Sequence, residues 1–358
     1  MEEFICATRI IMGAGAVEAL KNEHFQRLLI VSDPFFHQNG RAERLGQYAK
    51  EYRIFHKVMP DPSVELVAEG TALVKAFQPD GIVALGGGSA MDCAKAMAFF
   101  GGGDIPLIAI PTTSGSGSEV TDFAILTHNG VKHPLVDPLL RPKIAILDSD
   151  LLAELPQSLI ADCGFDILAH ALEAWVGKNA NAFTDALALD AFATAIEHLE
   201  ASFAGDRAVR LKVHTASTMA GLAFTHGGLG LCHALAHALG GQFHVPHGRL
   251  NAILLPAVIS CNAELAGAKY AELSRRMGLG SGSDAMSVRN LKNALIRLRS
   301  ALKLPGTLTQ AGVDPGNLKD LSDQIVSAAL ADPCCATNPV PVTAELLHRV
   351  LREVGGRG

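Results

Sequence analysis

A cluster of histidines gives the clearest indication of chemistry in this chain. Four of its 14 histidines lie in HALAHALGGQFHVPHG, residues 233–248: His233, His237, His244 and His247. His233 and His237 are four residues apart, so on a helix their side chains would share one face. The Gly-Gly pair after them would let the chain turn and bring His247 back. Imidazole is the commonest metal ligand in proteins, so the cluster predicts a metal site, although spacing alone does not say which histidines bind.

A second pair of candidate ligands precedes this cluster. In DILAHALEAWV, Asp166 and His170 are also four residues apart, on one face of a predicted helix. Such a pair on its own is more often a local polar contact. Followed by clustered histidines in a mostly apolar region, it instead favours a site with one carboxylate and several imidazoles. A donor set without sulfur suits Fe(II), Zn(II), Co(II) or Mn(II), and ligand type does not choose among them.

Two loops rich in glycine and hydroxyl groups indicate a phosphate-binding site. GGGSAMDCAKAMAFF, residues 86–100, follows a buried strand, and its glycines let the N-terminus of the next helix approach a phosphate closely. Ser89 could add a hydroxyl, and Asp92 falls in the first helical turn. Both this loop and the next, PTTSGSGSE, follow strands of a predicted sheet whose carboxyl ends are where dinucleotides bind. The second loop offers the hydroxyls of Thr112, Thr113, Ser114 and Ser116.

Asp33 ends an earlier strand, RLLIVSD, residues 27–33. A carboxylate at this place can bind an adenosine ribose diol and repel a 2′-phosphate, which favours NAD over NADP. A turn or a helix cap explains this aspartate about equally well when it is taken alone. The stretch GAGAVEAL, residues 13–20, meets the dinucleotide fingerprint only superficially, because Glu18 occupies its sixth position and a tight turn is favoured there. Asp33 and the two later loops together predict a dinucleotide site.

The elements that would position these residues fall into two halves. Up to about residue 150, short apolar strands alternate with helical patterns, which is typical of a parallel α/β sheet. Beyond it, apolar residues recur at helical spacing and β-branched runs become rare. We therefore expect an α/β, Rossmann-like dinucleotide-binding domain over residues 1–153 and an all-α metal-binding and catalytic domain over residues 154–358.

Composition excludes several classes of protein. The 358-residue chain carries a net charge of −6 and has no long basic run, which argues against nucleic acid and anionic membranes as partners. Its apolar runs are too short to span a bilayer, and its N-terminus is not expected to be a secretory signal. Seven scattered cysteines without a CxxC motif argue against a disulfide framework and for a reducing cytoplasm.

Taken in order, five motifs resemble those of a known family. GGGSAMDCAKA, PTTSGSGSEVT, AILDSDLLAELP, DILAHALEAWV and HALAHALGGQFHVPHGRLNAILLP closely resemble the motifs of the iron-containing (group III) alcohol dehydrogenases, and the likeness covers essentially the whole chain. Within the family, THGGLGLCHALAHALGGQFHVPHG and the tail ALADPCCATNPVPVTAELLHRVLREV look most like the 1-propanol dehydrogenase branch of propanediol-utilisation microcompartments. The resemblance implies the dehydroquinate synthase-like fold that this family shares.

The resemblance also implies a division of roles among the candidate residues. The metal ligands would be Asp166, His170, His233 and His247. His237 would lie beside the substrate and the nicotinamide as a proton carrier, with an orienting role as the alternative, and His244 would have no role of its own. Gly87, Gly88 and Ser89 would hold the cofactor pyrophosphate with Asp92 nearby, Thr112, Thr113 and Ser116 would line the cofactor site, Asp33 would bind the adenosine ribose, and Lys132 would lie near the nicotinamide ribose.

Two residues depart from the family pattern. Cys163 stands in ADCGFD where threonine is expected, and Arg249 stands in PHGRLNA where a small or apolar residue is usual. Cys163 could make the site sensitive to oxidation, and Arg249 could alter the mouth of the substrate site. The MEEF start shows no extended encapsulation peptide, so the resemblance leaves location inside a microcompartment open.

The function implied is NAD(H)-dependent interconversion of a short aldehyde, such as propionaldehyde, and its primary alcohol, with NAD recycled and Fe(II) or another divalent metal bound. The enzyme would be a cytoplasmic homodimer or larger assembly, with shell proteins or enzymes of a bacterial microcompartment as further candidate partners. One alternative is a zinc-dependent glycerol or polyol dehydrogenase of the same superfamily. Another is a metal-free binding partner in a microcompartment, which the intact set of candidate ligands argues against.

Overall fold

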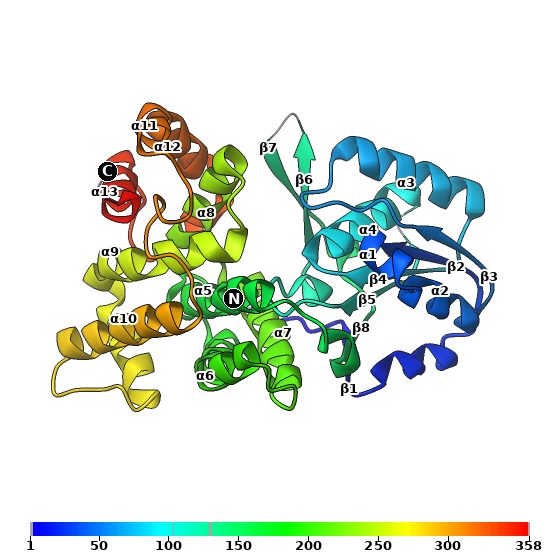
Figure 1. Cartoon of the computed structure of the whole chain (residues 1–358), viewed down its shortest axis with the longest axis horizontal. Helices are drawn as coiled ribbons and strands as arrows, with labels where there is room; N and C mark the ends of the chain where they lie inside the picture. Colours follow the sequence, from blue (N-terminus) through cyan, green and yellow to red (C-terminus); the bar gives the residue numbers. More distant parts are fainter. Residues whose placement is uncertain (1–2, 103, 129–130, 357–358) are drawn as a thin grey trace. The chain divides into compact units, whose positions relative to one another are not determined.

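The computed structural model describes residues 3–102, 104–128 and 131–356. The chain divides into two compact units, which we call the α/β unit and the helical unit (Figure 1). The α/β unit comprises Ile5–Leu155, and the helical unit comprises Met1–Phe4 and Pro156–Gly358. The sequence-based ranges change between residues 153 and 154.

A parallel sheet forms the centre of the α/β unit. Six of the described strands pair in the order β1-β8-β5-β4-β2-β3. Strands β4, β5 and β8 are buried along their whole length, which explains why they read as continuous apolar runs. The strands span Arg9–Gly13 (β1), Phe25–Ser32 (β2), Ala49–Phe55 (β3), Gly81–Gly86 (β4), Leu107–Pro111 (β5) and Ile144–Asp148 (β8), and a separate antiparallel pair spans Phe123–His128 (β6) and Val131–Val136 (β7).

Helices cover both faces of this sheet. On one face, α3 and α4 bury Val74 and Met97 against Ile82 of β4. On the other face, Phe36 and Leu45 belong to a second apolar cluster with residues of β2, β4, β5 and β8. The helices and 3-10 helices of this unit span Ala16–Asn22 (η1), Pro34–Gln38 (α1), Arg41–Leu45 (α2), Gly46–Tyr48 (η2), Val64–Phe77 (α3), Gly88–Gly101 (α4), Ser118–Val120 (η3), Pro138–Leu140 (η4) and Ser149–Leu152 (η5).

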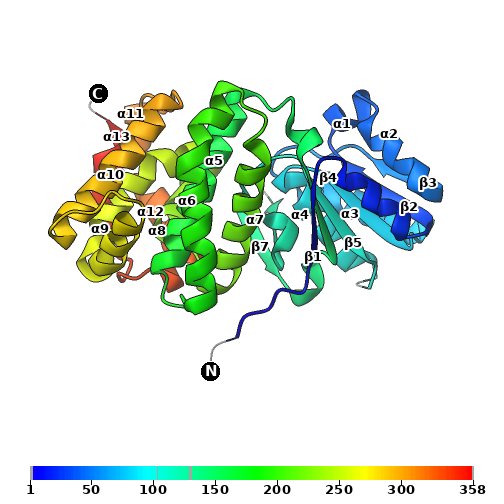
Figure 2. The same cartoon turned by 90° about the horizontal axis from the view of Figure 1, so that it is seen from below.

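The helical unit is built around three helices that lie side by side, α5, α6 and α7 (Figure 2). Helix α5 is buried from Ile160 onward along nearly all of its length, and it also packs against α9. The elements of the unit span Gln157–Val176 (α5), Ala182–Ala204 (α6), Arg210–Gly227 (α7), Leu231–Phe243 (α8), His247–Arg276 (α9), Asp284–Ala301 (α10), Pro315–Asp320 (α11), Ser322–Ala331 (α12), Pro333–Thr337 (η6) and Ala344–Gly355 (α13). The parallel sheet with its helices and the separate helical unit confirm the predicted fold class.

Helix α9 is the longest of the described helices, at 30 residues. Its length and apolar composition would allow it to cross a membrane, but 72% of its most apolar window is buried inside the protein, as in a core helix. Gly248, in its first turn, faces the carbonyl oxygen of Asp162 so closely that a Cβ would collide with this backbone atom. Glycine therefore allows the start of α9 to touch α5.

The chain reverses between α8 and α9 at a different place from the one predicted. The glycine pair Gly240–Gly241 lies inside α8, which continues to Phe243. The reversal follows at His244, whose φ of 55° is left-handed and ends the helix. A Cβ at Gly240 would lie 3.5 Å from a side-chain carbon of Leu250, an ordinary packing distance, so this position does not require glycine. The expectation that the glycines form the turn was therefore wrong, because α8 continues through them and the left-handed residue that ends it is His244, three residues after Gly241.

Phe4 groups with the helical unit, although the predicted range 1–153 includes it. Phe4 stacks on Phe183 with ring centroids 5.4 Å apart, and its ring also lies 4.6 Å from that of His226. Aromatic packing thus attaches Phe4 to α6 and α7.

Candidate active site

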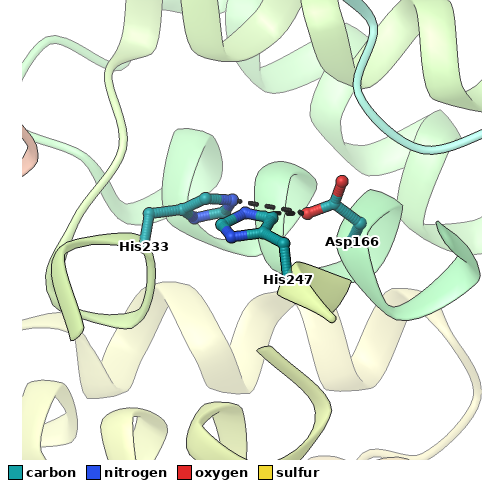
Figure 3. Close-up of side chains that lie close together, drawn as sticks. All are labelled: Asp166, His233 and His247. Atoms are coloured by element: carbon teal, nitrogen blue, oxygen red, sulfur yellow. Dashed lines mark ion pairs between the residues drawn. The ribbon is translucent and has the colours of Figure 1, made fainter. Parts of the chain in front are cut away.

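Three histidines from three helices converge on one carboxylate oxygen, that of Asp166, in the helical unit. Asp166 and His170 lie one turn apart on α5, His233 lies near the start of α8, and His247 is the first residue of α9. Asp166 Oδ1 is 3.4 Å from His247 Nε2, 3.6 Å from His233 Nε2 and 3.8 Å from His170 Nε2. Figure 3 shows both His233 and His247 directed at this oxygen.

These separations fit a shared metal ion better than they fit hydrogen bonds. They exceed the usual range of about 2.7–3.2 Å for N–H···O hydrogen bonds. Tetrahedral metal bonds of about 2.1 Å would place ligand atoms roughly 3.4 Å apart. The ligand atoms of Asp166, His233 and His247 all lie within 4.8 Å of one another. His170 reaches the same carboxylate oxygen, and its ring stacks on that of His233 at 4.5 Å.

The electrostatics of the site favour an ionised carboxylate. Burial alone would raise the pKa of Asp166, but His170, His247 and His233 hold it well below its usual range. Burial also lowers the pKa of His247 well below its usual value. For His233, the nearby Asp166 and Glu173 carboxylates outweigh burial and raise the pKa to about 9. Asp166 is therefore charged at neutral pH, as a metal ligand must be.

Glu173 holds His233 at Nδ1, the ring nitrogen that faces away from Asp166. The sequence analysis missed Glu173. It lies on α5, seven residues after Asp166, and its side chain is only 3% exposed. Its carboxylate is 2.7 Å from His233 Nδ1, and it accepts hydrogen bonds from the backbone N–H groups of Gly230 and Cys232 at 2.8 and 2.6 Å. A carboxylate at Nδ1 keeps that nitrogen protonated and leaves Nε2 free to bind a metal. The spacing of two helical turns from Asp166 was the available signal.

Asn251 supports the carboxylate itself, and it was also missed. It is fully buried on α9, four residues after His247 and therefore on the same helical face. Its Nδ2 donates a hydrogen bond to Asp166 Oδ1 at 2.8 Å and lies 3.3 Å from His247 Nε2. The amide thus fixes the orientation of the carboxylate around which the histidines gather.

His237 lies beside this group rather than within it. Its ring stacks on His247 with centroids 5.1 Å apart, and its Nδ1 is 2.8 Å from Asp332 Oδ2. Burial would raise the pKa of Asp332, but the contact with His237 lowers it to about 2. Asp332 therefore orients the His237 imidazole with Nε2 directed away from the carboxylate. His244, the fourth histidine of the cluster, is exposed at the end of α8.

The two residues that depart from the family pattern are both held by the helical unit. Arg249 donates to both carboxylate oxygens of Asp162, from Nε at 3.1 Å and from Nη2 at 3.0 Å. Asp162 lies one turn before Asp166, so this ion pair adjoins the group of candidate metal ligands. Burial raises the pKa of Cys163 well above its usual value. Its thiol is therefore poorly reactive, which does not support the expected sensitivity to oxidation.

In the α/β unit, the two glycine- and hydroxyl-rich loops lie against each other. Gly87 is the N-cap of α4, and a Cβ there would lie 3.2 Å from Thr113 Oγ1. Gly88 is the first residue of α4, and a Cβ there would lie 3.3 Å from the Ser116 side chain. The predicted phosphate-binding helix N-terminus thus faces the predicted hydroxyls. Of the other residues named from the sequence, Ser89 follows in the first turn of α4, and the backbone N–H of Thr112 bonds to Gly86 at 2.9 Å.

Asp33 acts as a helix cap and also reaches the glycine-rich loop. Its Oδ1 accepts a hydrogen bond from the backbone N–H of Phe36 at 3.0 Å, which begins α1. Its Oδ2 would lie 3.5 Å from a Cβ on Gly86. One oxygen therefore serves as the cap that the sequence analysis kept as the alternative, while the other adjoins the predicted nucleotide loop. Lys132, on β7, pairs with Asp61 at 2.6 Å.

Asp92 braces the second loop together with a residue that the sequence analysis missed, Lys95. Asp92 accepts hydrogen bonds from Ser118 Oγ at 2.9 Å and from the backbone N–H of Ile125 at 3.1 Å. Lys95 is fully buried one turn further along α4, and its Nζ donates to Ser118 and Thr121 at 2.9 and 2.8 Å. Burial lowers the pKa of Lys95 to about 8. Both side chains hold the loop against α4, and their spacing of three residues was the available signal.

Comparison with known families agrees with this architecture. The family model "Iron-containing alcohol dehydrogenase" matches residues 7–149, and "Fe-containing alcohol dehydrogenase family, C-terminal" matches residues 160–355. The chain is 38% identical to the 1-propanol dehydrogenase PduQ of Salmonella typhimurium, covering 99% of this chain and 100% of that protein. It is 34% identical to an NADPH-dependent butanol dehydrogenase of Clostridium saccharobutylicum, covering 98% and 97% of the two chains.

Solved structures show the same relationship. An iron-containing alcohol dehydrogenase from Thermococcus thioreducens is similar with a TM-score of 0.92 and 33% identity, covering 98% of this chain and 99% of that one. A 1,3-propanediol oxidoreductase is similar with a TM-score of 0.93 and 29% identity, covering 99% and 100%. The family models and the full-length relatives confirm the resemblance noted in the motifs. The chain therefore belongs to the iron-containing alcohol dehydrogenase family, whose enzymes act on alcohols and aldehydes.

Proposed function

We propose that this chain is an NAD(H)-dependent, metal-dependent alcohol dehydrogenase that interconverts propionaldehyde and 1-propanol and recycles NAD. The convergence of three imidazoles on Asp166 Oδ1 carries the proposal, since these separations suit a divalent metal. The similarity to the 1-propanol dehydrogenase PduQ supports the substrate class. The site would lie in the helical unit, and the nucleotide loops lie in the α/β unit.

The proposed ligands of the metal are Asp166, His170, His233 and His247, with Fe(II) as the resident ion. When bound, the metal would polarise the substrate oxygen and NADH would supply the hydride. Glu173 holds His233 with Nε2 facing Asp166, and Asn251 holds the Asp166 carboxylate. Rigid ligands of this kind matter because a displacement of one ångström can cost a large part of the rate.

His237 is the proposed proton carrier. Asp332 occupies its Nδ1, so its Nε2 is the nitrogen that would exchange a proton with the substrate oxygen, directly or through the nicotinamide ribose. The contact with Asp332 is equally compatible with a purely orienting role, and kinetics separate the two. A His237→Asn variant that keeps its metal but loses turnover with an altered pH profile would support proton transfer.

The proposed nucleotide site uses the N-terminus of α4. Gly87, Gly88 and Ser89 would hold the pyrophosphate, with Thr112, Thr113 and Ser116 lining the site and Lys132 near the nicotinamide ribose. Asp92 has a bracing role in the structure, so its part would be to fix the loop. The second oxygen of Asp33, Oδ2, which adjoins the glycine-rich loop, would accept from the adenosine ribose and repel a 2′-phosphate. Because a relative is named as NADPH-dependent, both cofactors need testing.

One experiment tests the proposal against its alternatives. Protein purified without oxygen is analysed for metal, then assayed for NADH and NADPH oxidation with propionaldehyde and for NAD reduction with glycerol. Bound iron and faster NADH oxidation with propionaldehyde support the proposal. Bound zinc with preferred oxidation of glycerol would identify a polyol dehydrogenase instead. A chain without metal or turnover after addition of Fe(II) or Zn(II) would be a binding partner rather than an enzyme.

We also propose a cytoplasmic homodimer or larger homo-oligomer, with a bacterial microcompartment as the alternative location. Similarity to PduQ over the full length supports this setting. Light scattering of the purified protein gives its oligomeric state. Co-purification with shell proteins from a host that expresses a microcompartment tests encapsulation.

A further inference from the structure

A second group of potential metal ligands lies in the helical unit beside the centre described above. His237 on α8, Asp332 at the N-cap of η6 and Cys334 within η6 offer a nitrogen, an oxygen and a sulfur atom. These three ligand atoms all lie within 4.8 Å of one another. We propose that His237, Asp332 and Cys334 form a second metal site, selective for a thiophilic divalent cation such as Zn²⁺ or Cd²⁺.

The geometry requires only small side-chain movements. His237 Nδ1 is 2.8 Å from Asp332 Oδ2, and the three ligand atoms span at most 4.8 Å. A tetrahedral zinc ion with bonds of about 2.0–2.3 Å separates its ligand atoms by roughly 3.3–3.8 Å. The imidazole and the carboxylate must therefore move apart by about 0.5–1 Å, and the thiol already lies within about 1.5 Å of a bonding position, which side-chain rotation provides. Three protein ligands leave one position for water.

The backbone holds this group in place. Asp332 Oδ1 accepts a hydrogen bond from the backbone N–H of Cys334 at 2.8 Å, which fixes the start of η6. Only 24% of the His237 side chain and 15% of the Asp332 side chain are exposed. This partial exposure lets a cation reach the ligands. The ligands are held in place because they belong to two different elements, α8 and η6.

The donor atoms give the two sites different preferences. The first centre offers nitrogen and oxygen only, a set that also accepts Fe(II), Mn(II) and Co(II). The second adds a thiol, and thiolates select softer cations such as Zn²⁺ and Cd²⁺. On binding, the metal–sulfur bond replaces the S–H bond of Cys334, and the proton leaves to water. The sulfur atom therefore distinguishes the second site chemically from the first.

Occupation of the second site has a consequence for the first. The His237 ring stacks on that of His247, so a ligand of the second site directly contacts a ligand of the first. A cation held by His237 would prevent this imidazole from exchanging a proton with the substrate. This expectation rests on the proposed function. We expect Zn²⁺ to inhibit the iron-loaded enzyme at concentrations that leave its iron bound.

Cadmium titration tests the site without relying on activity. The Cys6→Ser background removes an exposed thiol. In the iron-loaded protein, Cd²⁺ should produce the ultraviolet absorption of a cadmium–thiolate bond, and dialysis should show one more bound metal per chain. Cys334→Ser should lose both the absorption and the extra ion. Cys335→Ser is the matched control, because the Cys335 thiol donates to the carbonyl of Ala329, and it should keep both.

Each outcome decides the proposal. The absence of thiolate absorption in the parent protein, or its survival in Cys334→Ser, would overturn it, as would an equal loss in Cys335→Ser. Retention of the first metal by Cys334→Ser shows that this variant is folded. A chain that turns over no aldehyde but still forms the Cys334-dependent cadmium complex would contradict the proposed function and leave the second site standing.

Discussion

At the scale of single residues, the candidate metal centre depends on side chains that bind no metal themselves. Glu173 and Asn251 contact the proposed ligands directly, at 2.7 and 2.8 Å. Both are buried, so each of their polar atoms needs a partner inside the protein. They restrict His233 and Asp166 to the orientations that a metal requires.

Replacing Glu173 by glutamine should weaken metal binding. Glutamine keeps the shape but loses the charge that favours a protonated Nδ1 on His233, and substitutions of this kind typically cost about 10–100-fold in metal affinity. Competition with a chelator measures the effect. Glu200→Gln, on the exposed surface of α6, is the matched control and should leave affinity unchanged. Equal affinities for the Glu173 variant and the parent would contradict this role.

The sequence revealed the proposed ligands better than it revealed their supports. Asp166 and His170 could be identified from the sequence because they are four residues apart and so lie on one face of a helix. Glu173 contacts His233, which is 60 residues away in the sequence, and Asp332 contacts His237, which is 95 residues away. Such contacts depend on how the helices pack, and no local periodicity records them. Asp33 shows a third case, since its capping role and its proximity to the nucleotide loop occur together.

At the scale of elements, the start of α9 must lie directly against α5. Gly248→Ala would drive a Cβ into the carbonyl of Asp162, and backbone atoms yield less readily than side-chain ends. We expect a loss of about 1–3 kcal/mol in the free energy of unfolding, together with weaker metal binding because His247 precedes this glycine. Chemical denaturation and chelator competition measure the two effects.

Gly267→Ala in the same helix is the control for this substitution. A Cβ there would meet open space, so alanine should stabilise α9 by about 0.5–1 kcal/mol through its higher helix propensity. If both alanine variants changed stability in the same direction, close packing at Gly248 would not explain the result.

The contact between α4 and the second nucleotide loop predicts a pH dependence. Burial lowers the pKa of Lys95 to about 8, against the opposing effect of Asp92 and Glu119. Between pH 8 and its ordinary value of 10.5, the folded state therefore binds fewer protons at Lys95 than the unfolded state does. Stability should rise with pH across this window relative to Lys95→Met, by about 1–3 kcal/mol.

Denaturation midpoints at several pH values test this dependence. Lys75→Met, on the exposed face of α3, is the control and should follow the parent protein at every pH. Parallel pH profiles for the parent and Lys95→Met would show that Lys95 keeps its ordinary pKa.

The elements also show where local sequence signals fail. The glycine pair in α8 predicted a turn, but the helix continues through it, and a left-handed His244 makes the reversal instead. Strand and helix types in both units followed from periodicity, because buried strands and amphipathic helices leave patterns within a few residues. The sheet order β1-β8-β5-β4-β2-β3 required the structure, since it pairs segments more than a hundred residues apart.

At the scale of the whole molecule, metal should stabilise one unit far more than the other. The proposed ligands come from α5, α8 and α9, so a bound ion joins three helices of the helical unit. A metal concentration of 100 times the dissociation constant adds about 2.7 kcal/mol to the stability of a unit that binds it only when folded. Hydrogen exchange with and without metal should therefore slow in these helices and stay constant in the six-stranded sheet.

This measurement separates the units where a single melting curve would not, because proteins of two compact units need not unfold in one step. Hydrogen exchange of the metal-loaded protein is compared with that of chelator-treated protein. The Gly267→Ala variant, which should stabilise α9 without changing a ligand, is the control. Uniform slowing of exchange in both units would argue against a metal centre confined to the helical unit.

Gly230 is the N-cap of helix α8 and has no side chain with which to cap it. The Glu173 carboxylate on α5 takes that part, accepting from the N–H groups of Gly230 and Cys232, and its charge suits the positive end of the helix dipole. The N-terminus of α8 is thus capped by a side chain of another helix, α5. A start displaced by one residue would rotate His233 away from Asp166 by about 100°. Glu173 therefore fixes both the N-terminus of α8 and the orientation of His233, so one side chain couples the start of this helix to the candidate metal centre.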